Sequence, residues 1–156
     1  MSFEKRYMQR AIQLSINSVH QGGGPFGAVI VKAGQIVATG NNRVTLNCDP
    51  TAHAEIIAIR RACRRLRTFD LSGCELYASC EPCPMCLSAI YWAHIDKIYY
   101  ANRKTDAQAI GFDDAFIYNE LERQPEQRRL KAEHIDGTNA IDAFELWKCK
   151  TDKTEY

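Results

Sequence analysis

Two short stretches of this chain carry the side chains best suited to hold a metal ion and move protons. They are His53-Ala54-Glu55 and Pro82-Cys83-Pro84-Met85-Cys86. Zinc accepts histidine nitrogen and cysteine sulfur in tetrahedral geometry, and a catalytic zinc site keeps three protein ligands and one position for water. The two stretches therefore predict a site for one zinc ion, with His53, Cys83 and Cys86 as its ligands.

Glu55 is a carboxylate at this predicted site that zinc does not need as a ligand. Zinc can lower the pKa of its water to about 7, so hydroxide is available at neutral pH. A neighbouring carboxylate can accept the water proton and return it to a leaving amine, acting first as general base and then as general acid. We therefore expect hydrolysis by zinc-bound hydroxide, with Glu55 as the proton shuttle.

Cys80 offers an alternative arrangement of the site. If it bound the metal as a fourth ligand, the site would be closed and structural, as in a noncatalytic zinc-binding module. The sequence predicts Cys80 at the end of a strand, whereas Cys83 and Cys86 are three residues apart and share one helix turn. The spacing favours three protein ligands and a water, and the four-ligand module stays as the alternative.

The spacing of the site residues also predicts how the chain must present them. His53 and Glu55 are two residues apart, and residues at that spacing do not share a helix face. If both lie in the first turn of a helix, a common target must lie ahead of its N-terminus. Cys83 and Cys86 frame the start of a second helix, because proline suits the first helical position. We expect two helix N-termini to point at one zinc, where their partial positive charge favours thiolates.

Hydrophobic periodicity and turn residues predict the elements that hold these stretches. Apolar residues at helical spacing predict helices over residues 3–20, 51–66, 84–91 and 138–147, with short helices over 105–110 and 113–121. Apolar, β-branched runs predict strands over residues 26–31, 36–40, 74–79, 95–101 and, more weakly, 130–135. The first two strands form a hairpin. Residues 41–50 and 123–129 are expected to be loops.

The order of these elements indicates the fold class. Helices that alternate with short strands predict an α/β domain, and the hairpin predicts a mixed rather than wholly parallel sheet. At 156 residues the chain can bury such a core without disulfides. We expect one domain over residues 1–156, with a five-stranded mixed sheet in a three-layer α/β/α arrangement.

The amino-acid composition indicates which kinds of binding partner and which cellular compartment to expect. Hydrophobic residues make up 46% and charged residues 25%, as in ordinary soluble globular proteins. A net charge of +1 favours a small neutral substrate over nucleic acid or an anionic membrane. The charged N-terminal residues contain no signal core, and no window approaches about eighteen apolar residues. Seven cysteines, three of them clustered, suit a metal site in a reducing compartment, so we expect a cytoplasmic protein.

Several motifs together resemble those of a known superfamily. They are residues 24–31, 49–55, 79–86, 91–93 and 111–118. In these residues the chain resembles the cytidine-deaminase-like zinc deaminases, whose zinc signature is His-x-Glu followed by Pro-Cys-x-x-Cys. Gly111-Phe112-Asp113-Asp114 and the Lys-Thr-Glu-Tyr sequence that ends at Tyr156 are narrower and resemble the bacterial guanine deaminases. The resemblance implies a cytidine-deaminase-like fold and the same zinc ligands and proton shuttle.

The resemblance also implies a reaction and a set of substrate contacts. The reaction is hydrolysis of guanine to xanthine and ammonia, with hydroxide attacking C6. Asn42 is similar to the family's asparagine that hydrogen-bonds the purine, and Phe26 to its ring-stacking aromatic. Trp92 is expected nearby in the pocket, and Ala54 among the substrate-binding residues.

Asp114 and Tyr156 complete the residues that the resemblance implies. Asp114 resembles a second catalytic carboxylate that faces the base, and Tyr156 resembles a residue that closes over the ligand. Guanine presents N1–H and a 2-amino group as donors to a carboxylate, whereas adenine presents neither. Asp114 would therefore select guanine. Its alternative role is that of a helix-capping aspartate.

Other substrates stay open at this stage. A tRNA adenosine deaminase would share the zinc ligands and Asn42, and the arginines between residues 60 and 67 would then bind RNA. These arginines flank the apolar stripe of one helix, which is typical of a solvated face, so nucleic acid is not the expected partner. Ammeline and cytosine are further aminated rings that fit. The resemblance implies a homodimer whose tail, about residues 149–156, covers an active site of its own or the partner's chain.

Overall fold

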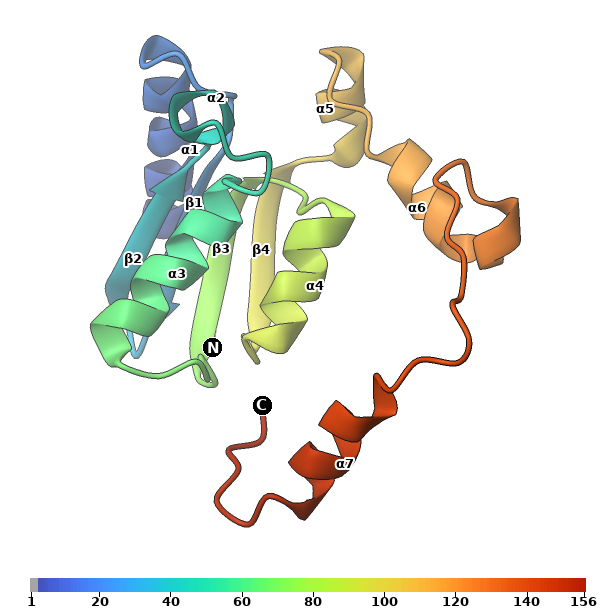
Figure 1. Ribbon diagram of the computed structural model, residues 1–156. Coiled ribbons are helices and arrows are strands. Elements are labelled where there is room, and N and C mark those ends of the chain that lie inside the picture. The colour runs from blue at the N-terminus through green and yellow to red at the C-terminus, as the bar shows by residue number, and fades with distance from the viewer. Residues whose placement is uncertain (1–2) are drawn as a thin grey trace.

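A mixed sheet of four strands, in the order β2-β1-β3-β4, forms the centre of the fold. The computed structural model describes residues 3–156. β1 (Gly27–Lys32) and β2 (Gln35–Asn41) form the predicted antiparallel hairpin. β3 (Cys74–Cys80) pairs antiparallel with β1, and β4 (Lys97–Asn102) runs parallel to β3 (Figure 1).

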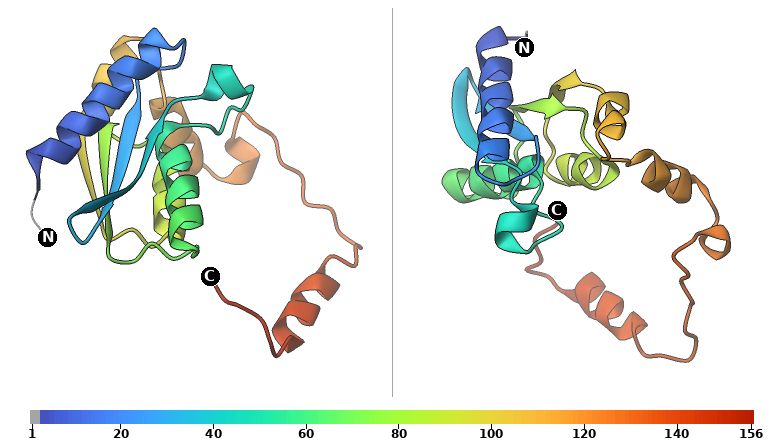
Figure 2. Two further views of the ribbon diagram at one scale, coloured as in Figure 1. Left: turned by 90° about the vertical axis from the view of Figure 1, so that its left-hand side faces the viewer. Right: turned by 90° about the horizontal axis from the view of Figure 1, so that it is seen from above.

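Helices cover both faces of this sheet. α1 (Lys5–His20) lies on one face, and α3 (Ala54–Leu66) and α4 (Pro84–Trp92) lie on the other (Figures 1 and 2). Alternate residues of β1 enter two separate cores, because successive side chains of a strand point to opposite faces. Val29 and Val31 pack on the α1 side, whereas Ala28 and Ile30 pack on the side of α3 and α4. The three-layer α/β/α prediction is confirmed.

α3 begins at Ala54, three residues later than predicted, because Asp49 stabilises a turn ahead of it. The Asp49 Oδ1 atom accepts hydrogen bonds from the Thr51 amide at 2.8 Å and from the Thr51 hydroxyl at 2.7 Å. Such side-chain bonds to the backbone compete with helix formation. His53 is therefore the N-cap residue of α3 rather than a residue of its first turn. A short helix that was not predicted, α2 (Val44–Asn47), lies in the loop that follows β2.

The outer edge of β2 is covered by arginines of α3. Arg61 donates to the Thr39 carbonyl at 2.9 Å, and Arg65 donates to the Val37 carbonyl at 3.0 Å. Unpaired carbonyls on an edge strand invite pairing with another chain, and charged side chains over the edge oppose it. Two of the arginines between residues 60 and 67 therefore have a structural role at the sheet edge.

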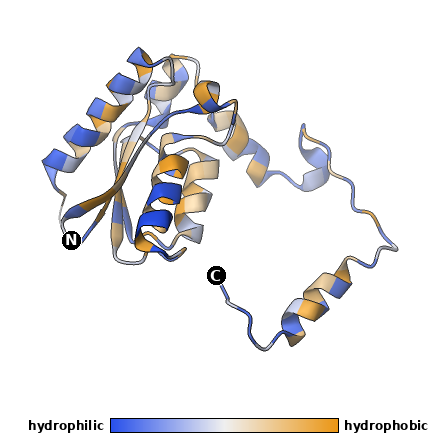
Figure 3. Cartoon of the chain, turned by 60° about the vertical axis from the view of Figure 1, so that its left-hand side comes forward, coloured by the Kyte–Doolittle hydropathy of each residue, from blue (hydrophilic) through white to orange (hydrophobic). Residues whose placement is uncertain are grey.

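The C-terminal third of the chain continues beyond the layered core. It contains α5 (Lys104–Ala109), α6 (Ala115–Glu122), the 3-10 helix η1 (Pro125–Gln127) and α7 (Ile141–Cys149). Figure 1 shows the segment after α6 running away from the sheet to α7. Both α6 and α7 carry hydrophobic residues, coloured orange in Figure 3. Among the described residues, no helix combines the length and apolar character needed to cross a bilayer.

The strand predicted over residues 130–135 is wrong, so the sheet of residues 3–156 has four strands rather than five. Leu130 is 83% exposed and Ile135 is 62% exposed, and the segment has no strand pairing. A strand is stabilised by a neighbour that supplies hydrogen bonds and a packed face. This segment lies away from both sheet edges and has neither (Figure 1).

Candidate active site

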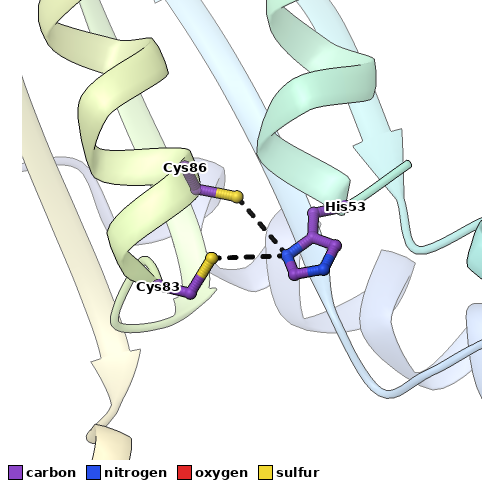
Figure 4. A group of neighbouring side chains, drawn as sticks. All are labelled: His53, Cys83 and Cys86. Atoms are coloured by element: carbon purple, nitrogen blue, oxygen red, sulfur yellow. Dashed lines mark hydrogen bonds between the residues drawn. The ribbon is translucent and has the colours of Figure 1, made fainter. Parts of the chain in front are cut away.

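Three donor atoms from two helices converge ahead of the helix N-termini (Figure 4). His53 Nδ1 lies 3.5 Å from Cys83 Sγ and 3.5 Å from Cys86 Sγ. The donor atoms of these three residues all lie within 4.8 Å of one another. The structure thus brings together the three residues that the sequence predicts as zinc ligands.

These donors fit one zinc ion. For bonds of about 2.3 Å to sulfur and about 2.0 Å to nitrogen at tetrahedral angles, the nitrogen and sulfur atoms are about 3.5 Å apart. The observed separations from His53 Nδ1 equal that value. His53 is the N-cap residue of α3 and Cys83 that of α4, so two helix N-termini point at the cluster, as predicted. The partial positive charge of those N-termini stabilises thiolate ligands.

The hydrogen bonds within the cluster shift the pKa values of His53, Cys83 and Cys86. The hydrogen bond from Cys86, together with that from His53, lowers the pKa of Cys83 to about 4. The same bond to Cys83 raises the pKa of Cys86, and burial adds to this rise. The hydrogen bond to Cys83 also raises the pKa of His53. A thiolate next to an imidazole is the donor chemistry that zinc prefers.

Glu55 lies beside the cluster without belonging to it. Its Oε2 atom accepts a hydrogen bond from Cys86 Sγ at 3.4 Å, and the side chain is buried. Burial is the main cause that raises the pKa of this carboxyl. A buried carboxyl next to a metal centre, and not needed as a ligand, is placed to exchange protons there.

Cys80 lies outside the donor cluster. Its thiol donates to the Arg103 carbonyl at 3.7 Å, and it is not among the described residues that group as metal ligands. Burial, assisted by the charge of Glu55, raises the pKa of Cys80 to about 11, so the group stays a thiol. Among the described residues, the donor group therefore contains three protein side chains without Cys80, which fits the predicted three-ligand site.

Asn42 directly follows β2 and is buried, and its side-chain amide has a defined orientation. The side-chain oxygen accepts hydrogen bonds from the Gly24 amide at 3.3 Å and from the Val44 amide at 3.2 Å. Because both partners are donors, the atom that faces them must be the oxygen. The Asn42 NH2 group is thereby left to donate elsewhere.

Phe26 directly precedes β1 and contacts both Asn42 and the Gly-Phe-Asp-Asp motif of residues 111–114. The backbone carbonyl of Phe26 accepts a hydrogen bond from the Asn42 amide at 3.0 Å. Its ring meets the ring of Phe112 edge-on, with centroids 4.9 Å apart and an interplanar angle of 88°. This ring contact places the Gly-Phe-Asp-Asp motif next to Phe26. The motif can be identified in the sequence, but no sequence signal predicts this contact.

Asp114 precedes α6 as its N-cap residue and makes no cap hydrogen bond with its side chain. The cap bond is made by Asp113 instead, whose Oδ1 atom accepts from the Ala115 amide at 3.1 Å. Burial is the main cause that raises the pKa of Asp114, and the charge of Cys83 adds to it. The carboxylate of Asp114 therefore has no capping role in α6.

Trp92 and Tyr156 lie at the other end of α4. Trp92 is the last residue of this helix and Cys83 its N-cap, which places them about 13 Å apart along the axis at about 1.5 Å per residue. Tyr156 approaches Trp92 with ring centroids 6.1 Å apart, and Phe69 at 6.4 Å. Within one chain, neither residue is brought to the cluster.

Comparison with known proteins places the chain among zinc deaminases. The profile of the cytidine and deoxycytidylate deaminase zinc-binding region matches residues 1–102. The chain is 49% identical to the guanine deaminase of Bacillus subtilis over 151 residues, which cover 96% of this chain and 97% of that protein. The X-ray structure of the B. subtilis guanine deaminase matches with a TM-score of 0.96 and 47% identity, over 99% of each chain.

A second group of relatives is similar over a shorter span. The tRNA-specific adenosine deaminase of Aquifex aeolicus is 43% identical over 95 residues, covering 61% of this chain and 63% of that protein. The zinc-binding profile likewise ends at residue 102, before the segment that contains Asp114. Similarity over nearly the whole chain is thus found with a guanine deaminase, and similarity over the shared metal region extends to other deaminases.

Proposed function

Because this chain belongs to the cytidine and deoxycytidylate deaminase zinc-binding family, we propose that it hydrolyses guanine to xanthine and ammonia. The observation that carries the choice of guanine is the similarity to a guanine deaminase over 96% of the chain. That span includes the C-terminal third beyond residue 102, where the zinc-binding profile ends. Asp114 lies in this additional part and supplies the carboxylate that guanine's donors require.

The position of attack on the ring must be C2. Guanine carries its amino group on C2, while its C6 already bears the carbonyl oxygen that xanthine retains. Water adds its oxygen to C2, and the bond from C2 to the amino nitrogen breaks. One proton of the water ends on the amino nitrogen, which leaves as ammonia, and the other ends on N3 of xanthine. The expectation of attack at C6 is therefore wrong for guanine, since C6 carries the amino group in adenine and not in guanine.

Glu55 is the proton carrier in the proposed mechanism. When bound by His53, Cys83 and Cys86, zinc supplies a Lewis acid that makes water acidic enough to react at neutral pH. Glu55 accepts the proton that the attacking water loses and passes a proton to the amino nitrogen as the bond to C2 breaks. Its burial and its distance of 3.4 Å from Cys86 support this role.

The remaining contacts follow from the donors and acceptors that the site offers. Asp114 accepts from the N1–H and 2-amino groups of guanine, and the NH2 group of Asn42 donates to a ring acceptor. Phe26 stacks against the base. Ala54 is the first residue of α3, where a helix leaves its amide without a partner, so it donates to the substrate. The open Asn42 NH2 group and the uncapped Asp114 carboxylate support these assignments.

A homodimer explains how Trp92 and Tyr156 contribute. The tail, residues 149–156, is the part of the proposed single domain that covers an active site, and Tyr156 lies at the far end of α4 from its own cluster. The helix before it exposes large apolar side chains: Ile141, Phe144 and Leu146 are 58%, 73% and 74% exposed. Such a surface is typical of an interface. In the proposed dimer the tail and Trp92 serve the site of the second copy.

Subunit mixing tests this arrangement. A Glu55→Gln variant has an inactive site and an intact tail, and a variant that lacks residues 149–156 has an intact site and no tail. If the tail acts on the partner, mixing the two inactive variants restores guanine turnover through mixed dimers. Activity that stays absent after subunit exchange, confirmed by mass spectrometry, contradicts action on the partner.

We place the protein in the cytoplasm. None of the seven cysteines in residues 3–156 forms a disulfide, and reduced cysteines are typical of a reducing compartment. Fractionation of cells that express the full chain with an epitope tag tests this assignment. Recovery in the membrane or extracellular fraction contradicts it.

The substrate is tested with the purified full chain against guanine, guanosine, adenine, cytosine, cytidine, ammeline and a substrate tRNA. Ultraviolet spectra and ammonia release are followed together. We expect xanthine from guanine in preference to every other product. Turnover of another ring without xanthine formation contradicts the substrate, whereas loss of all turnover in a zinc-loaded sample contradicts the enzymatic function.

A further inference from the structure

α6, which follows Asp114, has little apolar packing to hold it in place. Phe116, Ile117 and Leu121 on this helix are 42%, 45% and 58% exposed. Figure 1 shows α6 beside the layered core rather than on a face of the sheet. The position of Asp114 must therefore depend on specific contacts at the start of the helix.

Tyr118 makes such a contact with the metal-binding loop. Its hydroxyl donates to the Pro82 carbonyl at 3.2 Å, and Pro82 directly precedes the ligand Cys83. The Lys104 ammonium lies 4.8 Å from the centre of the Tyr118 ring. The Lys104 amide in turn donates to Glu81 at 3.1 Å, so the same loop holds the start of α5.

Tyr118 is also linked to Asp114 by helix geometry. The Tyr118 amide donates to the Asp114 carbonyl at 3.1 Å, and residues four apart share one helix face. On the other side of Asp114, Phe112 packs on the ring of Phe26 at 4.9 Å. Asp114 thus lies between two anchors, one on Phe26 and one on the residue before Cys83.

We propose that Tyr118 is a positioning residue that holds Asp114 in place for guanine binding through its hydrogen bond to Pro82. The inference rests on the proposed function, in which Asp114 binds guanine. Tyr118 does not touch the substrate and acts through Asp114. It sets how well the site binds guanine while leaving zinc in place.

Tyr118→Phe is the sharpest variant, because it keeps the ring and its contact with Lys104 and removes only the hydroxyl. We expect kcat/KM for guanine to fall about five- to tenfold, the range for one net hydrogen bond. Zinc content and the absorption spectrum of the cobalt-substituted protein stay unchanged. Tyr91→Phe is the matched control, since Tyr91 is 75% exposed, and it is expected to behave like the unmodified protein.

A double-mutant cycle separates positioning of Asp114 from a general structural role. Guanine affinity is measured in the Glu55→Gln background, where substrate binds without being consumed, for Asp114→Ala, Tyr118→Phe and the two together. If Tyr118 acts through Asp114, Tyr118→Phe weakens binding when Asp114 is present and has no further effect in the Asp114→Ala variant. Equal effects of Tyr118→Phe in both backgrounds, or unchanged affinity and kcat/KM, overturn the proposal, as does loss of zinc. If the unmodified protein does not turn over guanine, it is the proposed function that fails.

Discussion

The Ala115 amide donates to the Asp113 carboxylate at 3.1 Å, so the first of two adjacent aspartates caps α6. Asp114, the second, makes no cap bond and is partly withdrawn from solvent. Burial raises the pKa of Asp114, with a further contribution from Cys83, whereas capping engages Asp113. The two neighbouring aspartates thus have different roles: Asp113 stabilises the start of α6, and Asp114 is available to bind the substrate.

Replacing each aspartate separately tests this division. Asp114→Ala is expected to lower kcat/KM for guanine about 100-fold, because two hydrogen bonds to a charged acceptor are lost. Asp113→Ala is expected to lower the free energy of unfolding by about 1 kcal/mol through loss of the cap, with guanine turnover near that of the unmodified protein. Steady-state kinetics and urea denaturation measure the two effects. A larger kinetic loss from Asp113→Ala than from Asp114→Ala contradicts the assignment.

Glu55→Gln separates proton transfer from metal binding. The amide is isosteric with the carboxyl but cannot accept and return a proton, so kcat is expected to fall about 100- to 10,000-fold. Zinc stoichiometry is expected to stay at one per chain, because His53, Cys83 and Cys86 form the donor group without Glu55. Elemental analysis and kcat are measured on the same sample. Loss of zinc in this variant would show that Glu55 is a ligand.

The identity of the metal ligands could be predicted from sequence because they lie in local motifs whose residue types determine the chemistry. The orientation of the Asn42 side chain could not be predicted, because it depends on the backbone amides of Gly24 and Val44. Gly24 belongs to another loop. The contact of Tyr118 with Pro82 joins residues 36 positions apart and has no local signature. Long-range contacts of this kind appear only when the chain is folded.

The errors in the predicted elements have physical causes of the same kind. The segment 130–135 has apolar residues but no sheet edge beside it, so strand propensity alone did not predict its state. The sequence pattern predicts the start of α3 too early, because Asp49 stabilises a turn rather than capping the helix. Trp92 lies at the C-terminal end of α4 and Cys86 near its start, so the expected role of Trp92 in the pocket stays a prediction that depends on the dimer.

Cysteine substitutions test the three-ligand site. Cys83→Ala is expected to lose zinc, because a catalytic site with two protein ligands binds the ion weakly. Cys80→Ala is expected to keep one zinc per chain, since the Cys80 thiol donates to the Arg103 carbonyl and lies outside the donor group. Elemental analysis and the absorption of cobalt-substituted samples measure this. Loss of metal from Cys80→Ala as complete as that from Cys83→Ala establishes Cys80 as a fourth ligand and the third through sulfur.

The raised pKa of Cys80 predicts slow alkylation. With a pKa of about 11, the thiol is protonated at neutral pH and its thiolate fraction increases only as the pH approaches that value. At about pH 8 roughly one thousandth is thiolate, and only the thiolate reacts with iodoacetamide. Mass spectrometry of the zinc-loaded protein is expected to show modification of the exposed Cys48 and Cys149 well before Cys80. Modification of Cys80 as fast as that of Cys48 contradicts the prediction.

The arginines of α3 offer a test between a structural and an RNA-binding role. Arg61 and Arg65 donate to the carbonyls of Thr39 and Val37 on the edge strand β2. Replacing either by alanine removes one such bond and is expected to lower the free energy of unfolding by about 0.5–1.5 kcal/mol. Arg64→Ala is the matched control on the exposed face of the same helix, with a smaller expected effect.

Binding of tRNA at several salt concentrations completes this test. A role in RNA binding predicts that each arginine replacement weakens affinity and reduces its salt dependence. The structural role predicts weak binding that does not change among the three variants, together with loss of stability in two of them. A tRNA affinity that falls for Arg61→Ala and Arg65→Ala at unchanged stability contradicts the structural role. Because guanine contacts none of these residues in the proposed site, guanine turnover by the folded variants is expected to stay the same.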